Sequence, residues 1–215
     1  AFELARSRAS ASNKPGHLTL VDKANAIRPQ EIWTRVFAEV GKDYPDIKQD
    51  HAYVDAFAML MIQKPEYYDT IVTTNLYGDI LTDLGSMLQG GIGIAASANL
   101  HPGKTSMFEP IHGSAPDIAG KGIACPLAAI MAAGMMLDYL GESDSANRIE
   151  SSVEHLLASG QITSLDATSG LSTTQIGDMV VGQVRKSKQR LGRRDHRVRR
   201  DFKKIFSVFS ARSMA

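Results

Sequence analysis

Two aspartates one helical turn apart, Asp79 and Asp83, are the residues of this sequence best suited to binding a metal ion. They fall in the segment 78–88, whose apolar residues have helical spacing, so both carboxylates would share one helix face. Two like charges so placed repel each other, and a hard divalent cation such as Mg²⁺ or Mn²⁺ would relieve that repulsion. The alternative is a solvated helix face with Asp79 as the N-cap.

Further polar residues follow two predicted strands. Lys23 and Asn25 come just after the strand 17–21, at the end where ligands bind in open α/β sheets. A lone lysine at that place is more commonly a surface charge, which is the alternative. Asp55 follows the strand 47–53 and starts an almost entirely apolar helix, where a carboxylate needs a partner because burying it bare is costly. The alternative role for Asp55 is the N-cap of that helix.

The stretch 108–122 is long, has no clear periodicity, and is rich in Gly, Pro and small polar residues. A loop of this kind inside a compact domain is uncommon unless it binds something, and its backbone N–H groups could cradle phosphate. Asp117 could accept a hydrogen bond from a ribose diol and would repel a 2′-phosphate, which favours NAD over NADP. An ordinary surface loop with His112 packed beneath it is the alternative. The glycine cluster at 89–93 lacks the GxGxxG pattern, and we interpret it as a flexible crossing.

The composition is that of a globular chain with room for one large domain or two small ones. It has 215 residues, of which 43% are hydrophobic and 22% charged. No apolar run reaches the ~20 residues that a bilayer span requires, and the first residues lack the apolar core of a signal peptide. A single cysteine, Cys125, excludes an internal disulfide and favours a reducing compartment, so we expect a cytoplasmic protein.

The formal net charge of +1 conceals a basic tail. Residues 185–215 hold twelve of the 24 Lys and Arg residues but two of the 23 Asp and Glu residues. Such a tail could contact nucleic acid or an anionic membrane surface. We expect instead a disordered or non-native extension, with neither a membrane nor a nucleic acid as partner.

Four motifs in register resemble those of the β-decarboxylating dehydrogenases, the family of isopropylmalate, isocitrate, homoisocitrate and tartrate dehydrogenases. The motifs are 21–25, 53–56, 75–83 and 109–122, and the order and spacing match through about Val184. The resemblance is strongest to the isopropylmalate and tartrate branches. It implies an α/β fold of the isopropylmalate-dehydrogenase type, with two lobes around a cleft, distinct from a standard Rossmann domain.

The resemblance also implies a division of the chain, and an incomplete fold, because the family's chain begins well before Ala1. Residues 1–89 would be the remainder of the small lobe, which forms the dimer and binds the metal. Residues 90–184 would be the carboxyl-terminal part of the large, nucleotide-binding lobe, followed by the tail at 185–215.

The matched residues carry roles from the family. Lys23 would exchange a proton with the substrate hydroxyl, and Asp55, Asp79 and Asp83 would bind Mg²⁺ or Mn²⁺. Lys23, Asn25 and Asp55 would also contact the substrate. For a lysine to take a proton near neutral pH its pKa must be lowered, which burial beside a cation would do. Lys23 and Asp55 would complete the site of the partner subunit, so the homodimer would be the catalytic unit.

The resemblance places NAD on the loop and the residue that follows it. The cofactor-binding residues would be His112, Gly113, Ser114, Ala115, Asp117 and Cys125. Asp117 would contact the adenosine ribose. Cys125 stands where the family has an asparagine that contacts adenine, and a thiol is a weaker hydrogen-bonding partner.

The implied activity is the NAD-dependent and metal-dependent oxidation and decarboxylation of a 2-hydroxy-3-carboxy acid of the isopropylmalate, tartrate and isocitrate class. The catalytic tyrosine and the arginines that clamp the substrate carboxylates would lie in the missing part. We therefore expect the chain alone to be inactive. The alternative is a truncated, catalytically silent family member that acts as an interaction module with a basic tail.

Overall fold

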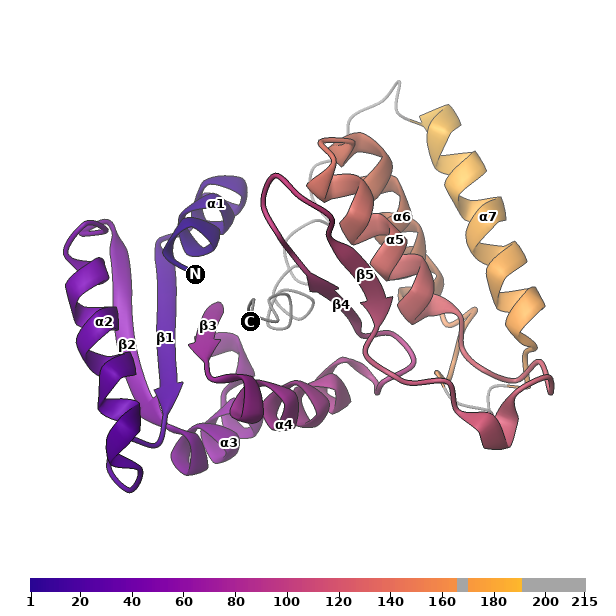
Figure 1. Ribbon diagram of the computed structural model, residues 1–215. Coiled ribbons are helices and arrows are strands. Elements are labelled where there is room, and N and C mark those ends of the chain that lie inside the picture. Colours follow the sequence, from indigo (N-terminus) through magenta and orange to yellow (C-terminus); the bar gives the residue numbers. More distant parts are fainter. Residues whose placement is uncertain (166–169, 191–215) are drawn as a thin grey trace. The chain divides into compact units, whose positions relative to one another are not determined.

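The computed structural model describes residues 1–165 and 170–190, which divide into two compact units (Figure 1). The first unit is Ala1–Gly85, and the second begins at Ser86. None of the helices in the described part of the chain is long and apolar enough to span a bilayer.

The first unit is built on a parallel sheet of three strands in the order β2-β1-β3 (Figure 1). The strands are β1 (Gly16–Asp22), β2 (Ile47–Tyr53) and β3 (Thr70–Thr73). Every residue of β1 is buried, as expected for a central strand covered on both faces. The register pairs Asp22 with Tyr53 and Val21 with Thr73, so the carboxyl ends of all three strands lie at one edge.

Helices connect and cover these strands. They are α1 (Phe2–Ser12), α2 (Glu31–Gly41), α3 (Val54–Gln63) and α4 (Asn75–Ser86), with short 3-10 turns at η1 (Arg28–Gln30) and η2 (Pro65–Tyr67). The ring of Phe2 stacks on Phe37 and Tyr44, with centroids 5.2 and 4.8 Å away. These rings pack against buried Leu18 and Ile47, which ties α1 and α2 to the sheet.

A polar network crosses β1 and β2 near their amino-terminal halves. Nε2 of His17 lies 2.7 Å from Oδ2 of Asp50, and the Tyr67 hydroxyl donates to the same carboxylate. Nζ of Lys48 is 3.1 Å from that oxygen. Three donors therefore converge on one partly buried carboxylate.

We expect Asp50→Asn to destabilise the protein in a pH-dependent way. Partial burial alone would raise the pKa of Asp50, but hydrogen bonds from Tyr67, Lys48 and His17 outweigh it and lower the pKa to about 2. Because the folded pKa is depressed, the carboxylate stabilises the fold above pH ~4, and this contribution is lost as the pH falls from ~4 to ~2. The variant should lose on the order of 1–2 kcal/mol at pH 7. Urea unfolding at several pH values measures this, and an identical pH profile in both proteins would contradict it.

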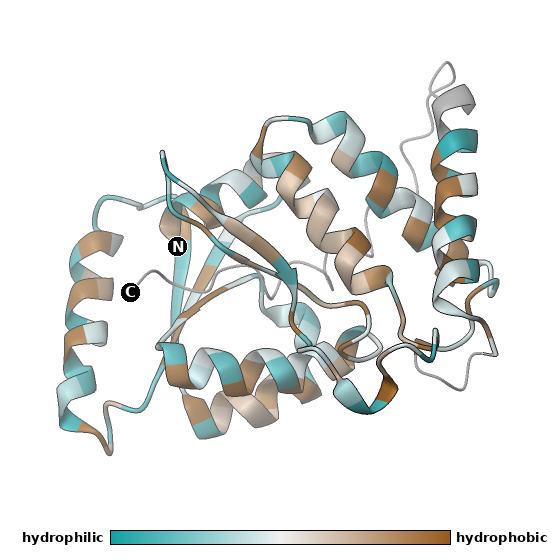
Figure 2. Cartoon of the chain, turned by 45° about the vertical axis from the view of Figure 1, so that its right-hand side comes forward, coloured by the Kyte–Doolittle hydropathy of each residue, from teal (hydrophilic) through white to brown (hydrophobic). Residues whose placement is uncertain are grey.

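The second unit packs three helices beside an antiparallel pair of strands. The strands are β4 (Ala96–Asn99) and β5 (Met107–Pro110), and the helices are α5 (Leu127–Tyr139), α6 (Ser143–Ala158) and α7 (Thr173–Arg190). Helix α5 packs against both strands, α6 packs against α5, and α7 packs against α6 (Figure 1). Figure 2 shows hydrophobic and hydrophilic bands along α7, typical of a helix with one packed face.

Three expectations about the elements need correction. Helix α4 begins at Asn75 and not at 78, so Asp79 lies in its second turn and is not the N-cap. The stretch predicted as a loop from 108 contains strand β5, and its irregular part begins at Ile111. Helix α7 continues through Arg190, so residues 185–190 of the predicted tail are helical, consistent with the good helix propensity of Arg, Lys and Gln. The rest of that tail, 191–215, lies outside the described residues.

Candidate active site

Lys23 and Asp55 form an ion pair at the carboxyl edge of the parallel sheet. Lys23 directly follows β1, and Asp55 lies in the first turn of α3, directly after β2. Nζ of Lys23 is 2.6 Å from Oδ1 of Asp55. The hydrogen bond from Lys23 lowers the pKa of Asp55, which therefore remains a carboxylate well below neutral pH.

The surroundings of Asp55 differ from the expectation. Its side chain is 67% exposed, so it is not buried among the apolar residues of α3, whereas the Lys23 side chain is 22% exposed. The N-cap position belongs to Tyr53, without a side-chain cap bond, so the capping role for Asp55 is wrong. An exposed carboxylate held by a lysine remains open to a further ligand on its other side.

The turn that carries Lys23 is held by residues that the sequence analysis did not single out. The Lys23 N–H donates to Oε1 of Gln30 at 2.7 Å. One oxygen of Asp22 accepts the N–H of Ala24 at 2.9 Å, and the other lies 3.0 Å from Nε2 of His51. The sequence signal for this turn was Asp22 itself. An aspartate side chain often accepts a hydrogen bond from the backbone N–H two residues later, here that of Ala24, and this contact forms an Asx-turn. The predicted substrate contact Asn25 is exposed in this turn.

Asp79 and Asp83 lie one turn apart on the same face of α4, because the helix is continuous across them. The helix starts after Thr74, whose carbonyl oxygen accepts the N–H of Gly78 at 2.8 Å. Asp79 is half-buried and Asp83 exposed. Within one copy of the described chain, no three His, Cys, Asp or Glu side chains are grouped closely enough to hold a metal ion. One copy therefore does not bring Asp55 together with this pair.

The predicted cofactor loop leaves β5 and is pinned at both ends. The Ile111 N–H donates to the Ala95 carbonyl at 3.1 Å. At the other end, Thr173 of α7 donates its N–H to the Gly122 carbonyl at 2.8 Å and its hydroxyl to the Ala124 carbonyl at 2.6 Å. Because both ends of the loop are already held, binding of a ligand to its middle residues would cost less conformational entropy than binding to a loop without these contacts.

The middle of the loop is exposed to solvent. The exposed residues named by the cofactor prediction are Gly113, Ser114, Ala115 and Asp117. Ala115 has a φ of 44°, a left-handed conformation that turns the chain sharply before η4 (Pro116–Ile118). His112 is half-buried, with Nδ1 3.1 Å from the Gly113 carbonyl oxygen. Cys125 is half-buried, and burial raises the pKa of its thiol, so it is a neutral group.

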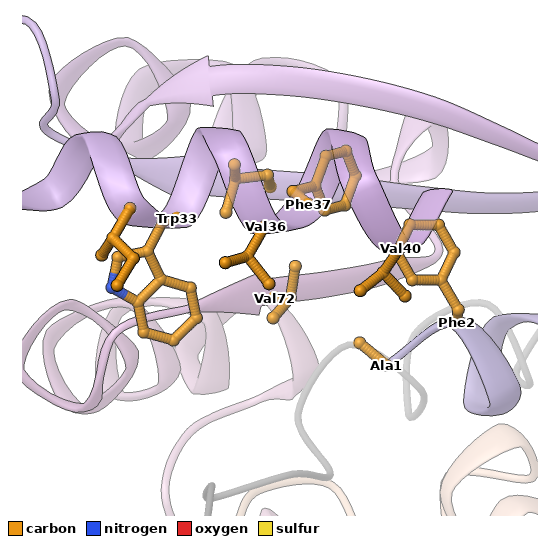
Figure 3. A pocket seen from close by; sticks show the side chains of 9 residues that line it. Ala1, Phe2, Trp33, Val36, Phe37, Val40 and Val72 are labelled. Atoms are coloured by element: carbon orange, nitrogen blue, oxygen red, sulfur yellow. The ribbon is translucent and has the colours of Figure 1, made fainter. Parts of the chain in front are cut away.

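An apolar groove of about 400 Å³ opens elsewhere on the first unit (Figure 3). Its lining comes from α1, α2, β1 and β3, and consists of Ala1, Phe2, Leu20, Ile32, Trp33, Val36, Phe37, Val40 and Val72. None of the predicted catalytic or metal-binding side chains lies in it. The side chains that line the groove carry no acid or base, so the groove itself supplies no group for proton transfer.

A family model described as isocitrate/isopropylmalate dehydrogenase matches residues 1–180 of the chain. The chain belongs to this family. The match confirms the resemblance drawn from the four motifs, all of which lie inside the matched range.

Curated relatives and solved structures of the family agree with the match. The chain is 45% identical over 187 residues to the 3-isopropylmalate dehydrogenase of Mycolicibacterium paratuberculosis. The aligned region covers 86% of this chain and 52% of that protein. For the enzyme of the same name from Corynebacterium glutamicum, identity is 46%, with 84% of this chain and 51% of that protein covered. The chain spans about half the length of the curated relatives it matches.

The solved structures confirm the α/β fold class. The isocitrate dehydrogenase of Methylococcus capsulatus superposes with a TM-score of 0.77 at 41% identity, covering 86% of this chain and 55% of that one. A β-decarboxylating dehydrogenase from Thermococcus kodakarensis gives a TM-score of 0.75 at 33% identity, with 91% and 57% covered. Over this part, the protein has the isocitrate-dehydrogenase-like fold.

Proposed function

We propose that this chain supplies the proton-transferring lysine, the metal ligands and the dinucleotide loop of an NAD-dependent β-decarboxylating dehydrogenase. The observation that carries the proposal is the 2.6 Å contact between Lys23 and Asp55 at the carboxyl edge of a parallel sheet, where ligands bind in folds of this type. The substrate class is the 2-hydroxy-3-carboxy acids. Isopropylmalate is the first candidate, because curated relatives at about 45% identity are named 3-isopropylmalate dehydrogenase.

The chemistry of the acidic residues fits a hard divalent cation. All three proposed ligands are carboxylates, and Mg²⁺ and Mn²⁺ prefer oxygen. Asp79 and Asp83 would offer oxygens from one helix face, and Asp55, exposed beside Lys23, would reach the site of a second copy. When bound, the cation would polarise the oxidised carbonyl group and stabilise the negative charge that develops as CO₂ leaves.

Lys23 would act by moving a proton. Its backbone is fixed at the sheet edge, and its ammonium is held by Asp55 at 2.6 Å, so Nζ has a defined position. In the proposed reaction the ammonium first releases a proton to solvent, and the neutral amine of Lys23 then takes the proton of the substrate hydroxyl as hydride leaves for NAD. While Lys23 is an ammonium, its hydrogen bond lowers the pKa of Asp55, which is therefore a carboxylate at neutral pH.

The loop of the second unit would hold NAD. Its exposed backbone around Gly113 and Ser114 can donate to phosphate oxygens, and the carboxylate of Asp117 is exposed for a ribose diol. The same negative charge disfavours a 2′-phosphate, so we propose NAD and not NADP as the cofactor.

A homodimer is part of the proposal, because the first unit leaves large apolar side chains open on two neighbouring helices. Met59 and Ile62 of α3 are 62% and 53% exposed, and Leu76 and Ile80 of α4 are 64% and 57% exposed. Helices α3 and α4 lie side by side in both views (Figures 1 and 2). Apolar surface gathered in this way is typical of a subunit interface.

Met59→Glu and Leu76→Glu are each expected to weaken this dimer about 100-fold, the effect of a central interface residue. Sedimentation velocity over a concentration series measures the dissociation constant. Val181→Glu on α7 is the matched control, since Val181 is also an exposed apolar residue on a helix. A dimer that resists both glutamates would place the interface on another face.

A further polypeptide would complete the enzyme. The curated relatives contain about as much chain again as the part matched here, and the apolar groove beside α2 is open. We propose that the portion of the relatives unmatched by this chain covers that groove and supplies the remaining active-site groups. Such a portion could be joined to this chain or be provided separately.

The test is reconstitution. The purified 215-residue chain alone is expected to show no NAD reduction with isopropylmalate, isocitrate, tartrate or malate in the presence of Mn²⁺. Co-expression with the amino-terminal half of a curated relative is expected to give Mn²⁺-dependent NADH formation, highest with isopropylmalate. Turnover by the chain alone would show that no second half is needed. A stable complex that is inactive on all four acids would refute the proposed function and favour an interaction module.

A further inference from the structure

We propose that Asp22 and His51 are positioning residues for Lys23, acting as a carboxylate–imidazole pair that fixes where the lysine ammonium lies. The catalytic relevance of this role rests on the proposed function, whereas the hydrogen bonds that support the role are independent of that function. Neither residue belongs to the proposed catalytic or metal-binding set.

Asp22 is the starting observation, because its side chain is completely buried at the last position of β1. A buried carboxylate is costly unless its oxygens are hydrogen-bonded. Both oxygens have a donor: Oδ1 accepts the Ala24 N–H at 2.9 Å, and Oδ2 lies 3.0 Å from Nε2 of His51. Because each oxygen of this buried carboxylate has its own hydrogen-bond donor, the carboxylate fixes the backbone at Ala24 and the side chain of His51 relative to the end of β1.

Lys23 sits inside the ring that these contacts close. Its neighbours on both sides, Asp22 and Ala24, are joined through the Asp22 side chain, and its own N–H donates to Gln30 at 2.7 Å. The Lys23 carbonyl accepts the Ile27 N–H at 2.8 Å. With its backbone held at these points, the Cα–Cβ bond of Lys23 has a fixed direction at the sheet edge, which lowers the conformational entropy lost when Nζ is ordered.

His51 links this turn to the strand that carries Asp55. It lies on β2, four residues before Asp55, and is opposite Leu20 of β1 in the register. Its ring contacts Tyr53 edge-on, with centroids 5.0 Å apart. The Asp22–His51 contact therefore fixes the end of β1 relative to the end of β2, and thus Lys23 relative to Asp55.

A second histidine–aspartate pair joins the same two strands, and it provides a control that distinguishes positioning of Lys23 from general stabilisation of the strand pairing. His17 of β1 contacts Asp50 of β2 at 2.7 Å, near the other end of the sheet. If such pairs only held the two strands together, breaking either one would loosen Lys23 to the same degree. If Asp22 and His51 position the lysine, only the loss of their contact will do so.

The experiment uses NMR of the full chain with ¹³C-labelled lysine, the Lys23 signal being assigned with Lys23→Arg. An ordered lysine shows two separate Hε resonances, and a freely rotating one shows a single averaged resonance. We expect two for Lys23 in the parent protein, one in His51→Phe, and two again in His51→Gln, whose amide can donate to Asp22. His17→Phe should leave Lys23 unchanged.

Hydrogen exchange of the Ala24 amide gives a second readout. Its exchange rate is expected to rise about tenfold in His51→Phe and to stay near the parent value in His51→Gln and His17→Phe. Separate Lys23 resonances in a folded His51→Phe, or equal collapse in His17→Phe, would overturn the proposal. Should His51→Phe fail to fold, His51→Ala makes the same comparison with a smaller side chain at a position that is 35% exposed. No turnover is measured, so failure of the proposed dehydrogenase activity would leave these outcomes readable.

Discussion

Replacing Lys23 with methionine is expected to lower kcat of the reconstituted enzyme by about 10³-fold, within the ~10²–10⁴-fold range of a general acid–base group. Methionine keeps the apolar stem of the side chain but cannot exchange a proton. Asp55 is left without its partner, but it is 67% exposed and remains solvated, so the fold should persist. Initial rates of NADH formation at saturating isopropylmalate and Mn²⁺ measure the loss.

Lys48→Met is the matched control for this substitution. Lys48 also pairs with an aspartate on β2, at 3.1 Å from Asp50, but it is not at the carboxyl edge of the sheet. Its replacement is expected to leave kcat unchanged. If the Lys23 variant retained more than about a tenth of the parent rate, the proton would have to be moved by another group.

The double substitution Asp79→Asn and Asp83→Asn is expected to raise the dissociation constant for Mn²⁺ by more than 100-fold, above the ~10–100-fold cost of changes outside the ligand set. Each asparagine keeps the size and one oxygen of the original side chain, but removes the charge that a hard cation requires. The electron paramagnetic resonance signal of free Mn²⁺ measures binding. The protein is used at concentrations that favour the proposed dimer, so that Asp55 of the second copy can take part.

A second acidic pair on the same chain provides the control. Glu150 and Glu154 are also four residues apart on one helix, α6. Burial raises the pKa of Glu154, and the negative charge of Glu150 raises it further. Replacing both with glutamine should leave Mn²⁺ binding unchanged. If the two double variants lost the same amount of Mn²⁺ affinity, Mn²⁺ would be binding nonspecifically to acidic helix faces, which would contradict the proposed site.

The strands of the first unit were predictable because their signals are local. The predicted strands 17–21 and 47–53 each follow a turn-forming segment, 12–16 and 44–46, and the structure has β1 and β2 over nearly the same residues. Strands β4 and β5 were not predicted. They are four residues each, rich in Ala, Ser and Asn in the case of β4, and they are covered by α5, which follows later in the chain. Their stability comes from this packing and not from intrinsic propensity.

The candidate site was predictable in its residue types and less so in its surroundings. Asp55 was expected to be buried because α3 is apolar almost throughout, but Met59 and Ile62 of that helix are exposed, so the pattern did not indicate a buried helix in one copy. The contact between Asp22 and His51 joins residues 29 positions apart. No periodicity reveals such a contact, because it depends on which strands become neighbours and in which register.

The order of the strands in the sheet has a consequence for biosynthesis. The central strand, β1, is made first, and its two neighbours follow at residues 47–53 and 70–73. At ~5–20 residues per second, the ribosome needs about one to four seconds to pass from the end of β2 to the end of β3. For that interval the edge of β1 that later pairs with β3 has unpaired backbone N–H and C=O groups, so pairing with another chain can compete there until translation delivers the last strand.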